Sequence, residues 1–291
     1  LTVNMGAGSQ INAATAGTGD IFFNPTTAGN VSVVTAGAGT NGLLNAGSTV
    51  SYGGGAVTTN VNQINGCVVS NGAGVSTASI TTATGDLNVG PFTSSSTTSF
   101  TANGAGADII TCGNINSGAG NLTLQAGSGA DADVKLNNNV TTTGTLAVNS
   151  GTGAGSDVTL AAGVTVSGGT TTVTTPNLVA GANSTLRAST GDLDVQTNAP
   201  GGGLSVNLSA GATLVSTNAD VGFNRTTAGA ITMTGGLGTL QAGGATPQVV
   251  FNGGNGANAV SVDVNNIIGC AEGSGSTYSV ITQTGDLNVG L

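Results

Sequence analysis

Short runs of alternating apolar and polar residues, separated by glycine-rich turns, constrain the fold of this chain more than any other feature. Clear examples are "NLTLQ" (121–125), "DVKLN" (133–137), "TLAVN" (145–149), "DVTLA" (157–161) and "DLDVQ" (192–196). Alternation with a period of two, bounded by turn residues, is typical of β-strands with one buried face. The sequence therefore predicts a chain made almost entirely of short strands.

Composition supports an ordered, all-β chain. Only 5% of the 291 residues are charged, against about 25% in an ordinary globular domain, and most of the strong helix formers are scarce, so we expect no long helix. The 52 glycines would also suit a flexible linker. Disordered chains usually carry a high net charge per residue, however, and their apolar residues are not placed regularly.

The charge balance excludes one class of partner. The net charge is −9, and the only cations are Lys135, Arg187 and Arg225, whereas a nucleic-acid surface needs clustered Lys or Arg. No apolar run approaches the ~18 residues that suggest a membrane helix, so we expect no membrane insertion. The chain begins without Met or a signal sequence, which favours a processed protein or a piece of a longer one. Abundant Thr, Ser and Asn favour a secreted or cell-surface location.

A long internal repeat divides the chain into one unit at 1–203 and a partial second unit at 204–291, continuous with the first. The matching phrases are "LTVNMGAGSQI" (1–11) with "LSVNLSAGATL" (204–214), "GDIFFNPTTAG" (19–29) with "ADVGFNRTTAG" (219–229), "VTTNVNQINGC" (57–67) with "VSVDVNNIIGC" (260–270), and "TGDLNVG" (84–90) with its identical copy (284–290). The few gaps between the two copies fall in glycine-rich stretches, where turns are expected.

A shorter spacing lies inside the long unit. Strand-like runs begin at Gly85, Gly120, Ser156 and Gly191, which gives steps of 35, 36 and 35 residues. Repeated short strands without helices predict a solenoid, in which each coil buries its apolar face against the next. We expect coils of about 20–25 residues. A β-sandwich also contains many short strands, but it does not predict either repeat.

The repeats resemble those of a known group of exported proteins. The runs "TGDLNV" (84–89), "GNLTLQAG" (120–127), "GTLAVNSG" (144–151) and "AAGVTVSGG" (161–169) are similar to the repeat regions of filamentous haemagglutinins, two-partner-secreted exoproteins and autotransporter adhesins. The resemblance implies a right-handed parallel β-helix, exported across an outer membrane, that acts as a fibrous adhesin or matrix component. The secretion domain of such proteins carries "NPNG" or "NPNL" motifs, and the stretches at 23–29 and 223–229 depart from them.

The cysteines allow two interpretations. Cys67 and Cys270 occupy equivalent places in the long repeat, and Cys112 lies in a similar setting. An odd number of cysteines in a secreted chain suggests pairing with an outside partner, so Cys67 could form a disulfide with Cys112 while Cys270 pairs with a cysteine outside this chain. The alternative is three buried, reduced thiols. Without histidine or a closely spaced cysteine pair, the sequence predicts no metal site and no cofactor.

Several acidic residues are candidates for catalytic or calcium-binding groups. Glycosidases need two carboxyl groups at set separations, and the pairs in question are Asp131 with Asp133 and Asp192 with Asp194. In "GDLDV" the apolar residues should face inward, which turns both aspartates outward to solvent. Glycine-rich fragments ending at Asp108, Asp131 and Asp157 resemble single pieces of a calcium-binding repeat, but they lack its nine-residue tandem spacing. No catalytic residue is predicted.

The recurring "GD" pairs are predicted to be structural turn residues. They are Gly85 with Asp86, Gly191 with Asp192, and Gly285 with Asp286. Glycine tolerates a positive φ, and aspartate at a turn can accept hydrogen bonds from nearby backbone N–H groups.

Three hypotheses about function remain. The leading one is a non-enzymatic, secreted structural protein, a β-solenoid that forms or belongs to an extracellular filament or surface fibre. Its partners would be copies of itself stacked end to end or the continuation of a longer chain. The second is a monomeric β-helical adhesin that binds host or cell-surface glycans or receptors. The third and most remote is a β-helix enzyme that degrades polysaccharides, which would require an acid cluster with a basic residue on one face.

Overall fold

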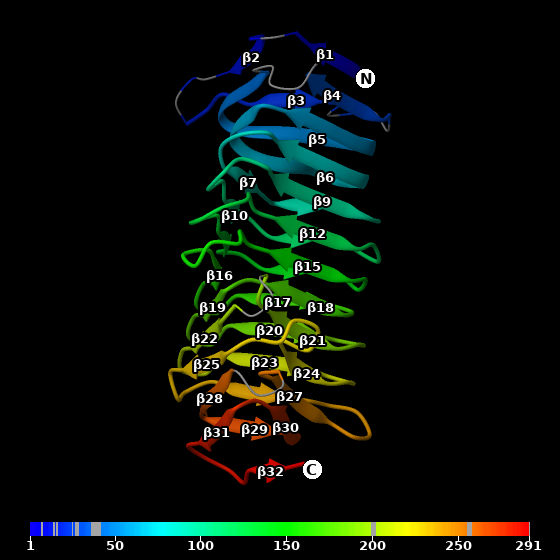
Figure 1. Ribbon diagram of the computed structural model, residues 1–291. Helices are drawn as coiled ribbons and strands as arrows, with labels where there is room; N and C mark the ends of the chain where they lie inside the picture. The colour runs from blue at the N-terminus through cyan, green and yellow to red at the C-terminus, as the bar shows by residue number, and fades with distance from the viewer. Residues whose placement is uncertain are drawn as a thin grey trace.

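The computed structural model describes residues 1–6, 8–13, 15, 17–24, 26, 29–35, 42–198, 202–254 and 258–290. This part of the chain is all-β, contains no helix, and winds into a parallel β-solenoid of about ten turns, so the prediction of a β-solenoid is confirmed. The N- and C-termini lie at opposite ends of the stack (Figure 1). Every pairing between described strands whose register is resolved is parallel, as stacked coils require.

From residue 87 onward the strands form three columns, each running along the solenoid axis. Column I contains β7 (Leu87–Val89), β10 (Ile109–Thr111), β13 (Val134–Leu136), β16 (Asp157–Leu160), β19 (Asn177–Ala180), β22 (Leu204–Leu208), β25 (Ile231–Thr234), β28 (Ala259–Val264) and β31 (Thr277–Thr282). Column II contains β8 (Phe92–Thr93), β11 (Ile115–Asn116), β14 (Val140–Thr141), β17 (Thr165–Gly168), β20 (Thr185–Ala188), β23 (Thr213–Ser216), β26 (Thr239–Gln241) and β29 (Asn266–Ile268). Column III contains β9 (Thr98–Ala102), β12 (Leu122–Gln125), β15 (Leu146–Asn149), β18 (Thr171–Thr174), β21 (Leu193–Gln196), β24 (Val221–Phe223), β27 (Gln248–Asn252), β30 (Cys270–Ser274) and β32 (Asn288–Val289).

The N-terminal coils are built from longer strands. They contain β1 (Thr2–Met5), β2 (Gln10–Ala13), β3 (Ile21–Phe23), β4 (Val31–Thr35), β5 (Leu43–Val61) and β6 (Gln63–Thr82). β6 pairs with β7 in column I and also with β9 in column III, so a single strand bends through most of one coil. The columns are therefore continuous from the N-terminal coils into the regular part of the stack.

Coil length varies around the expected value. Along column I, Leu87 pairs with Ile109, Ile109 with Val134, Val134 with Val158, and Val158 with Leu178, at steps of 22, 25, 24 and 20 residues. The 35-residue spacing in the sequence is not a coil period. Gly85 and Ser156 precede strands of column I, whereas Gly120 and Gly191 precede strands of column III, so that spacing alternates between two faces.

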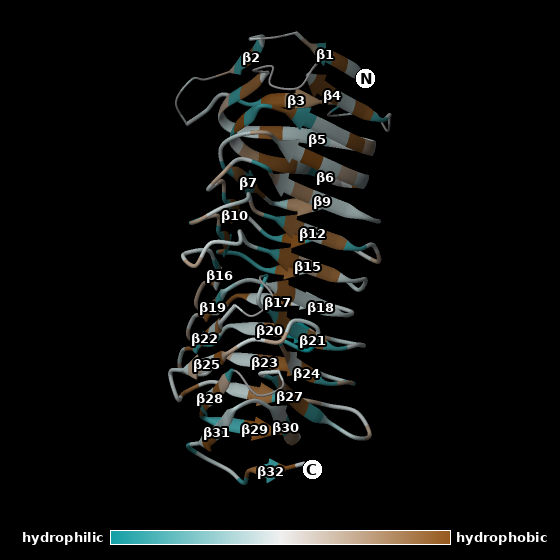
Figure 2. Cartoon of the chain, viewed as in Figure 1, coloured by the Kyte–Doolittle hydropathy of each residue, from teal (hydrophilic) through white to brown (hydrophobic). Residues whose placement is uncertain are grey.

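The core consists of inward side chains stacked from coil to coil. In β12, Leu122 and Leu124 are fully buried while Thr123 between them points outward. Leu124 is in register with Val148 in β15, and this residue is in register with Val173 in β18. Each fully buried Leu or Val contributes about 1.5–3 kcal/mol, and Figure 2 shows the apolar bands repeating from strand to strand.

Aromatic rings continue these stacks instead of forming a surface platform. Phe223 and Phe251 are parallel with ring centroids 5.2 Å apart, and Phe23 stacks on Tyr52 at 5.3 Å. All four rings are buried. Phe22 points the other way and is 58% exposed.

The two copies of the long repeat lie on different columns. The first "TGDLNVG" supplies β7 in column I, whereas its second copy supplies β32, which pairs with β30 in column III. β1 and its sequence counterpart β22 differ in the same way, because β1 leads through β4 and β5 into column III and β22 belongs to column I. The long repeat is therefore not a whole number of coils.

Candidate functional site

The aspartate before each of the column I strands β7, β10 and β13 connects one coil to the next. Asp86 Oδ1 accepts a hydrogen bond from the backbone N–H of Asp108 at 2.9 Å. Asp108 Oδ1 accepts one from Asp133 N–H at 2.8 Å, and Asp133 Oδ1 accepts one from Asp157 N–H at 2.8 Å. These aspartates form a ladder along the solenoid, in which each carboxylate binds the backbone of the coil that follows.

Columns II and III repeat this arrangement. In column III, Asp192 Oδ1 accepts Asp220 N–H at 3.1 Å, and Asp220 Oδ1 accepts Gln248 N–H at 3.0 Å. In column II, Asn114 Oδ1 accepts Asn139 N–H at 3.1 Å, and Asn139 Oδ1 accepts Thr165 N–H at 2.8 Å. An amide oxygen thus serves as well as a carboxylate, which shows that the position needs an acceptor more than a charge.

The "GD" turn residues occupy this position. Gly85 and Gly285 have φ of 72° and 78°, the left-handed region that favours glycine. The backbone group that Asp86 binds belongs to the next coil, 22 residues away, and not to its own turn. At Gly191 a side chain would collide with Thr170 of the preceding coil, so this glycine provides room for close stacking.

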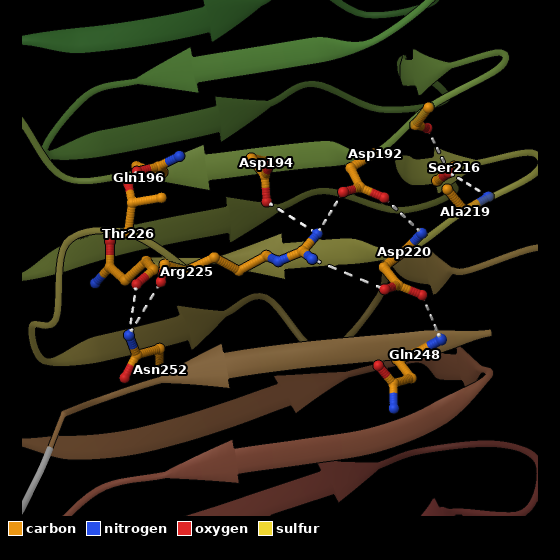
Figure 3. Close-up of polar contacts among 12 residues, drawn as sticks. Asp192, Asp194, Gln196, Ser216, Ala219, Asp220, Arg225, Thr226, Gln248 and Asn252 are labelled. Atoms are coloured by element: carbon orange, nitrogen blue, oxygen red, sulfur yellow. Dashed lines mark hydrogen bonds and ion pairs between the residues drawn. The ribbon is translucent and has the colours of Figure 1, made fainter. Parts of the chain in front are cut away.

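A cluster of three carboxylates surrounds Arg225 on the outer face of column III (Figure 3). Arg225 Nη1 lies 2.8 Å from Asp192 Oδ2 and 3.5 Å from Asp194 Oδ1, and its Nη2 lies 3.9 Å from Asp220 Oδ2. Asn252, one coil further on, donates to the backbone oxygen of Arg225 at 3.3 Å. The cluster therefore joins side chains and backbone from three successive coils.

Glycine at position 222 makes room for the arginine. Gly222 is the outward residue of β24 and is in register with Asp194. A Cβ atom on Gly222 would collide with Arg225 Cδ and with the carboxylate of Asp194. The arginine stem can cross the strand because this outward position has no side chain.

Burial and charge act in opposite directions in this cluster. Burial raises the pKa of Asp194 above its ordinary value of 3.8, because the nearby Arg225 only partly offsets the cost of desolvating the carboxylate. Burial also works to lower the pKa of Arg225, but the carboxylates of Asp194, Asp192 and Asp220 outweigh it and raise that pKa. Arg225 stays protonated and neutralises the cluster in part.

Sequence reasoning missed this cluster, although the internal repeat carries a signal for it. The phrase "ADVGFNRTTAG" has Gly222 and Arg225 where "GDIFFNPTTAG" has Phe22 and Pro25. Loss of the outward ring and gain of the arginine occur together, as expected if the two positions share one space. Comparing the copies position by position would have pointed to the pair.

A second, smaller cluster surrounds Lys135 on column I. Its Nζ forms an ion pair with Asp108 and lies 3.2 Å from Asp133 Oδ2. The hydrogen bond that Lys135 donates to the carboxylate of Asp108 is the largest cause of the raised pKa of Lys135. Asp131 is exposed, while burial is the largest cause of the raised pKa of Asp157.

The two aspartates of "GDLDV" lie on the outer face of column III. Leu193 and Val195 face the core, so Asp192 and Asp194 point outward as the alternation indicates. Asp192 Oδ2 and Asp194 Oδ1 lie against Arg225, and Asp192 Oδ1 accepts the backbone N–H of Asp220. Among the described residues, no group of three or more His, Cys, Asp or Glu side chains could hold a metal ion.

Cys67 and Cys112 are joined by a disulfide. Their Cα atoms are 6.4 Å apart, and the bond closes a separation of 45 residues. Cys67 lies in β6, and Cys112 follows β10, two coils further on in column I. Cys270 is a free, partly buried thiol.

Fold and site together define a parallel β-solenoid whose polar side chains mainly connect its own coils. The sequence matches no protein-family model, and comparison with curated proteins and with solved structures gave no match either. Within the described ranges, no helix is long and apolar enough to cross a membrane.

Proposed function

We propose that this chain is a non-enzymatic structural protein, a secreted β-solenoid that forms or belongs to an extracellular filament or surface fibre. The observation that carries the proposal is the state of the two ends. The partly buried apolar residues packed against the core are Val3, Ile11, Ala13, Ala161, Val280 and Leu287, and all but Ala161 lie in the first or last coils. Among the described residues, the core is therefore less completely covered at the two ends of the stack than between them.

Most exposed large apolar side chains of the described residues lie at the same places. Leu1, Phe22, Ile268, Tyr278, Ile281 and Val289 have exposed fractions of 54%, 58%, 45%, 38%, 52% and 63%, and Leu237, which lies between β25 and β26, has 55%. Unpaired strand edges next to exposed apolar groups favour pairing with further strands. Further coils, from another copy of the chain or from more of the same solenoid, would bury the inward-facing Tyr278 and Val289, which are in register with the buried Val260 and Ala271.

Two other observations support a non-enzymatic, exported protein. The acid cluster with a basic residue that a polysaccharide-degrading enzyme would require does occur around Arg225, but its carboxylates are engaged in ion pairs and in hydrogen bonds to the backbone of the next coil. The disulfide between Cys67 and Cys112 is typical of an oxidising compartment.

Electron microscopy of the purified chain tests the proposal. We expect fibres with an axial repeat of ~4.8 Å, and Val289→Lys should shorten them or abolish them by placing a charge on the inward face of the terminal strand, opposite the buried Ala271. The matched control is Thr172→Lys, on the outer face of β18 in the middle of the stack. Discrete particles of a single chain at all concentrations would contradict the proposal.

One observation favours the glycan-binding adhesin as a second candidate. Arg187 lies beside a surface hollow of about 510 Å³ on column II, together with Asn116, Thr141 and Ser167. None of the column II strands contains Asp or Glu. No described carboxylate lies within 4.0 Å of the Arg187 guanidinium, whose Nε donates to Thr217 at 3.1 Å.

An arginine beside hydroxyl and amide groups suits an acidic saccharide, because the guanidinium can bind a carboxylate through two hydrogen bonds. Binding of the intact chain to immobilised uronate and sulfated oligosaccharides tests this function. We expect Arg187→Ala to abolish binding and Arg225→Ala to leave it unchanged. Equal binding by all three proteins would exclude Arg187 as the anchor.

A further inference from the structure

One strand pairing occurs twice inside the chain with the same sequence pattern. β7, from "TGDLNV" (84–89), pairs with β10 of "ADII" (107–110), and Leu87 is in register with Ile109. β21, from "TGDLDV" (190–195), pairs with β24 of "ADVGF" (219–223), and Leu193 is in register with Val221. In both pairings, the strand that follows "TGD" lies one coil nearer the N-terminus than its partner strand. The residue just before that partner strand is an aspartate.

The same hydrogen bond accompanies each pairing. Asp86 accepts the N–H of Asp108 at 2.9 Å, and Asp192 accepts the N–H of Asp220 at 3.1 Å. The carboxylate of the second aspartate then binds the following coil, at Asp133 N–H or Gln248 N–H. Sequence, strand register and side-chain hydrogen bond thus agree in two separate places.

Both halves of this pairing occur once more, at opposite ends of the solenoid. "GDIFF" (19–23) contains β3, which pairs only with β5 among the described strands. Asp20 Oδ1 accepts the N–H of Thr49 at 2.9 Å, as the second aspartate of the pattern does, while the N–H of Asp20 donates to no described group. "TGDLNV" (284–289) contains β32, which pairs only with β30 among the described strands.

We propose that β32 of one copy pairs in parallel with β3 of a second copy, which joins the chains head to tail. Leu287 would lie opposite Ile21, Asn288 opposite Phe22, and Val289 opposite Phe23. The carboxylate of Asp286 would accept the N–H of Asp20, as Asp86 and Asp192 do inside the chain.

This join deepens the proposed filament and rests on it. It buries the exposed Val289 and the partly open Leu287 against the core of the next copy. The two surfaces are different patches on one chain, so the contact does not close on itself and continues as a fibre.

Cysteine cross-linking tests the register. In a Cys270→Ser background, Asn288→Cys combined with Phe22→Cys places two outward sulfurs on neighbouring strands about 4.8 Å apart, within disulfide range. We expect oxidation to give a ladder of covalent multimers, and peptide mass spectrometry to find position 288 linked to position 22. The matched control, Asn288→Cys with Thr2→Cys on β1, should form no such ladder.

A second pair of variants tests the hydrogen bond without changing the core. Asp286→Ala should raise the critical concentration for assembly about fivefold, the effect of one ordinary hydrogen bond. Asp286→Asn should leave it nearly unchanged, because the amide oxygen still accepts.

The outcomes separate this inference from the proposed function. Fibres whose position 288 links to position 2 instead of 22 would overturn the register and leave the filament standing. Chains that neither assemble nor cross-link under any condition would overturn both.

Discussion

The carboxylate of Asp86 accepts the backbone N–H of Asp108 at 2.9 Å, and these two residues occupy the same place in successive coils. Asp108 in turn accepts the N–H of Asp133. Each such side chain satisfies a backbone donor at a corner, just before the strand ladder begins. The solenoid therefore extends its hydrogen bonding beyond the strands with acidic and amide side chains.

The acceptor at position 86 should matter more than its charge. We expect Asp86→Asn to leave the urea midpoint unchanged and Asp86→Ala to lower stability by about 0.5–1 kcal/mol, because the corner loses one partly exposed hydrogen bond. Hydrogen exchange at the Asp108 amide is the specific readout and should accelerate only in the alanine variant. Equal exchange in all three proteins would show that the hydrogen bond has no role.

Titration of Asp194 should destabilise the fold as pH rises. Its folded pKa lies above the ordinary value of 3.8 because of burial, so the folded state binds more protons than the unfolded state in the window above 3.8. Wild-type stability relative to Asp194→Asn should fall as pH increases through that window and level off once the folded carboxyl is ionised. Urea unfolding of both proteins at about ten pH values between roughly pH 3 and pH 8 measures the difference in their unfolding free energies.

Asp20 provides the opposite sign as a control. Hydrogen bonds from the side chain and backbone of Thr49 lower its pKa, so its contribution is present above 3.8 and is lost as pH falls. The stability of wild type relative to Asp20→Asn should therefore decrease toward low pH. The same slope for Asp194 and Asp20 would contradict the assignment of burial as the dominant cause at Asp194.

Gly222 and Arg225 should be energetically coupled. Gly222→Ala places a Cβ atom where the arginine stem lies, and such overpacking costs about 1–3 kcal/mol. In an Arg225→Ala background the same change should cost much less, because the space is vacant. A double-mutant cycle measured by urea unfolding should give a coupling energy of about 0.5–3 kcal/mol, and an additive result would refute the steric argument.

Removing the disulfide should destabilise the N-terminal coils. The two cysteines are separated by 45 residues in the sequence. For a closed loop of that length, the chain-entropy model gives a stabilisation of about 4 kcal/mol. Reductant should lower the thermal midpoint of wild type toward that of a Cys67→Ser, Cys112→Ser double variant. It should leave that double variant unchanged, while Cys270→Ser should behave as wild type does.

Much of the fold could be predicted because strand alternation is a local property. Runs such as "NLTLQ" have Leu122 and Leu124 inside and Thr123 outside, as their spacing indicates. The repeated "TGDL" corner was also recognisable, since Gly85 requires a conformation that favours glycine. The partner of its aspartate was not, because that backbone group lies a full coil away.

The sequence by itself determined that this chain is a stack of short strands with polar, glycine-rich corners, because alternation and turn chemistry act over a few residues. Only the tertiary structure decided which residues meet across coils. Coil lengths of 20 to 25 residues between Leu87 and Leu178 shift every later residue along the axis. Asp192, Asp194 and Asp220 therefore converge on Arg225, and the two copies of one phrase fall on different columns. These accumulated offsets depend on the whole chain, and no local pattern contains them.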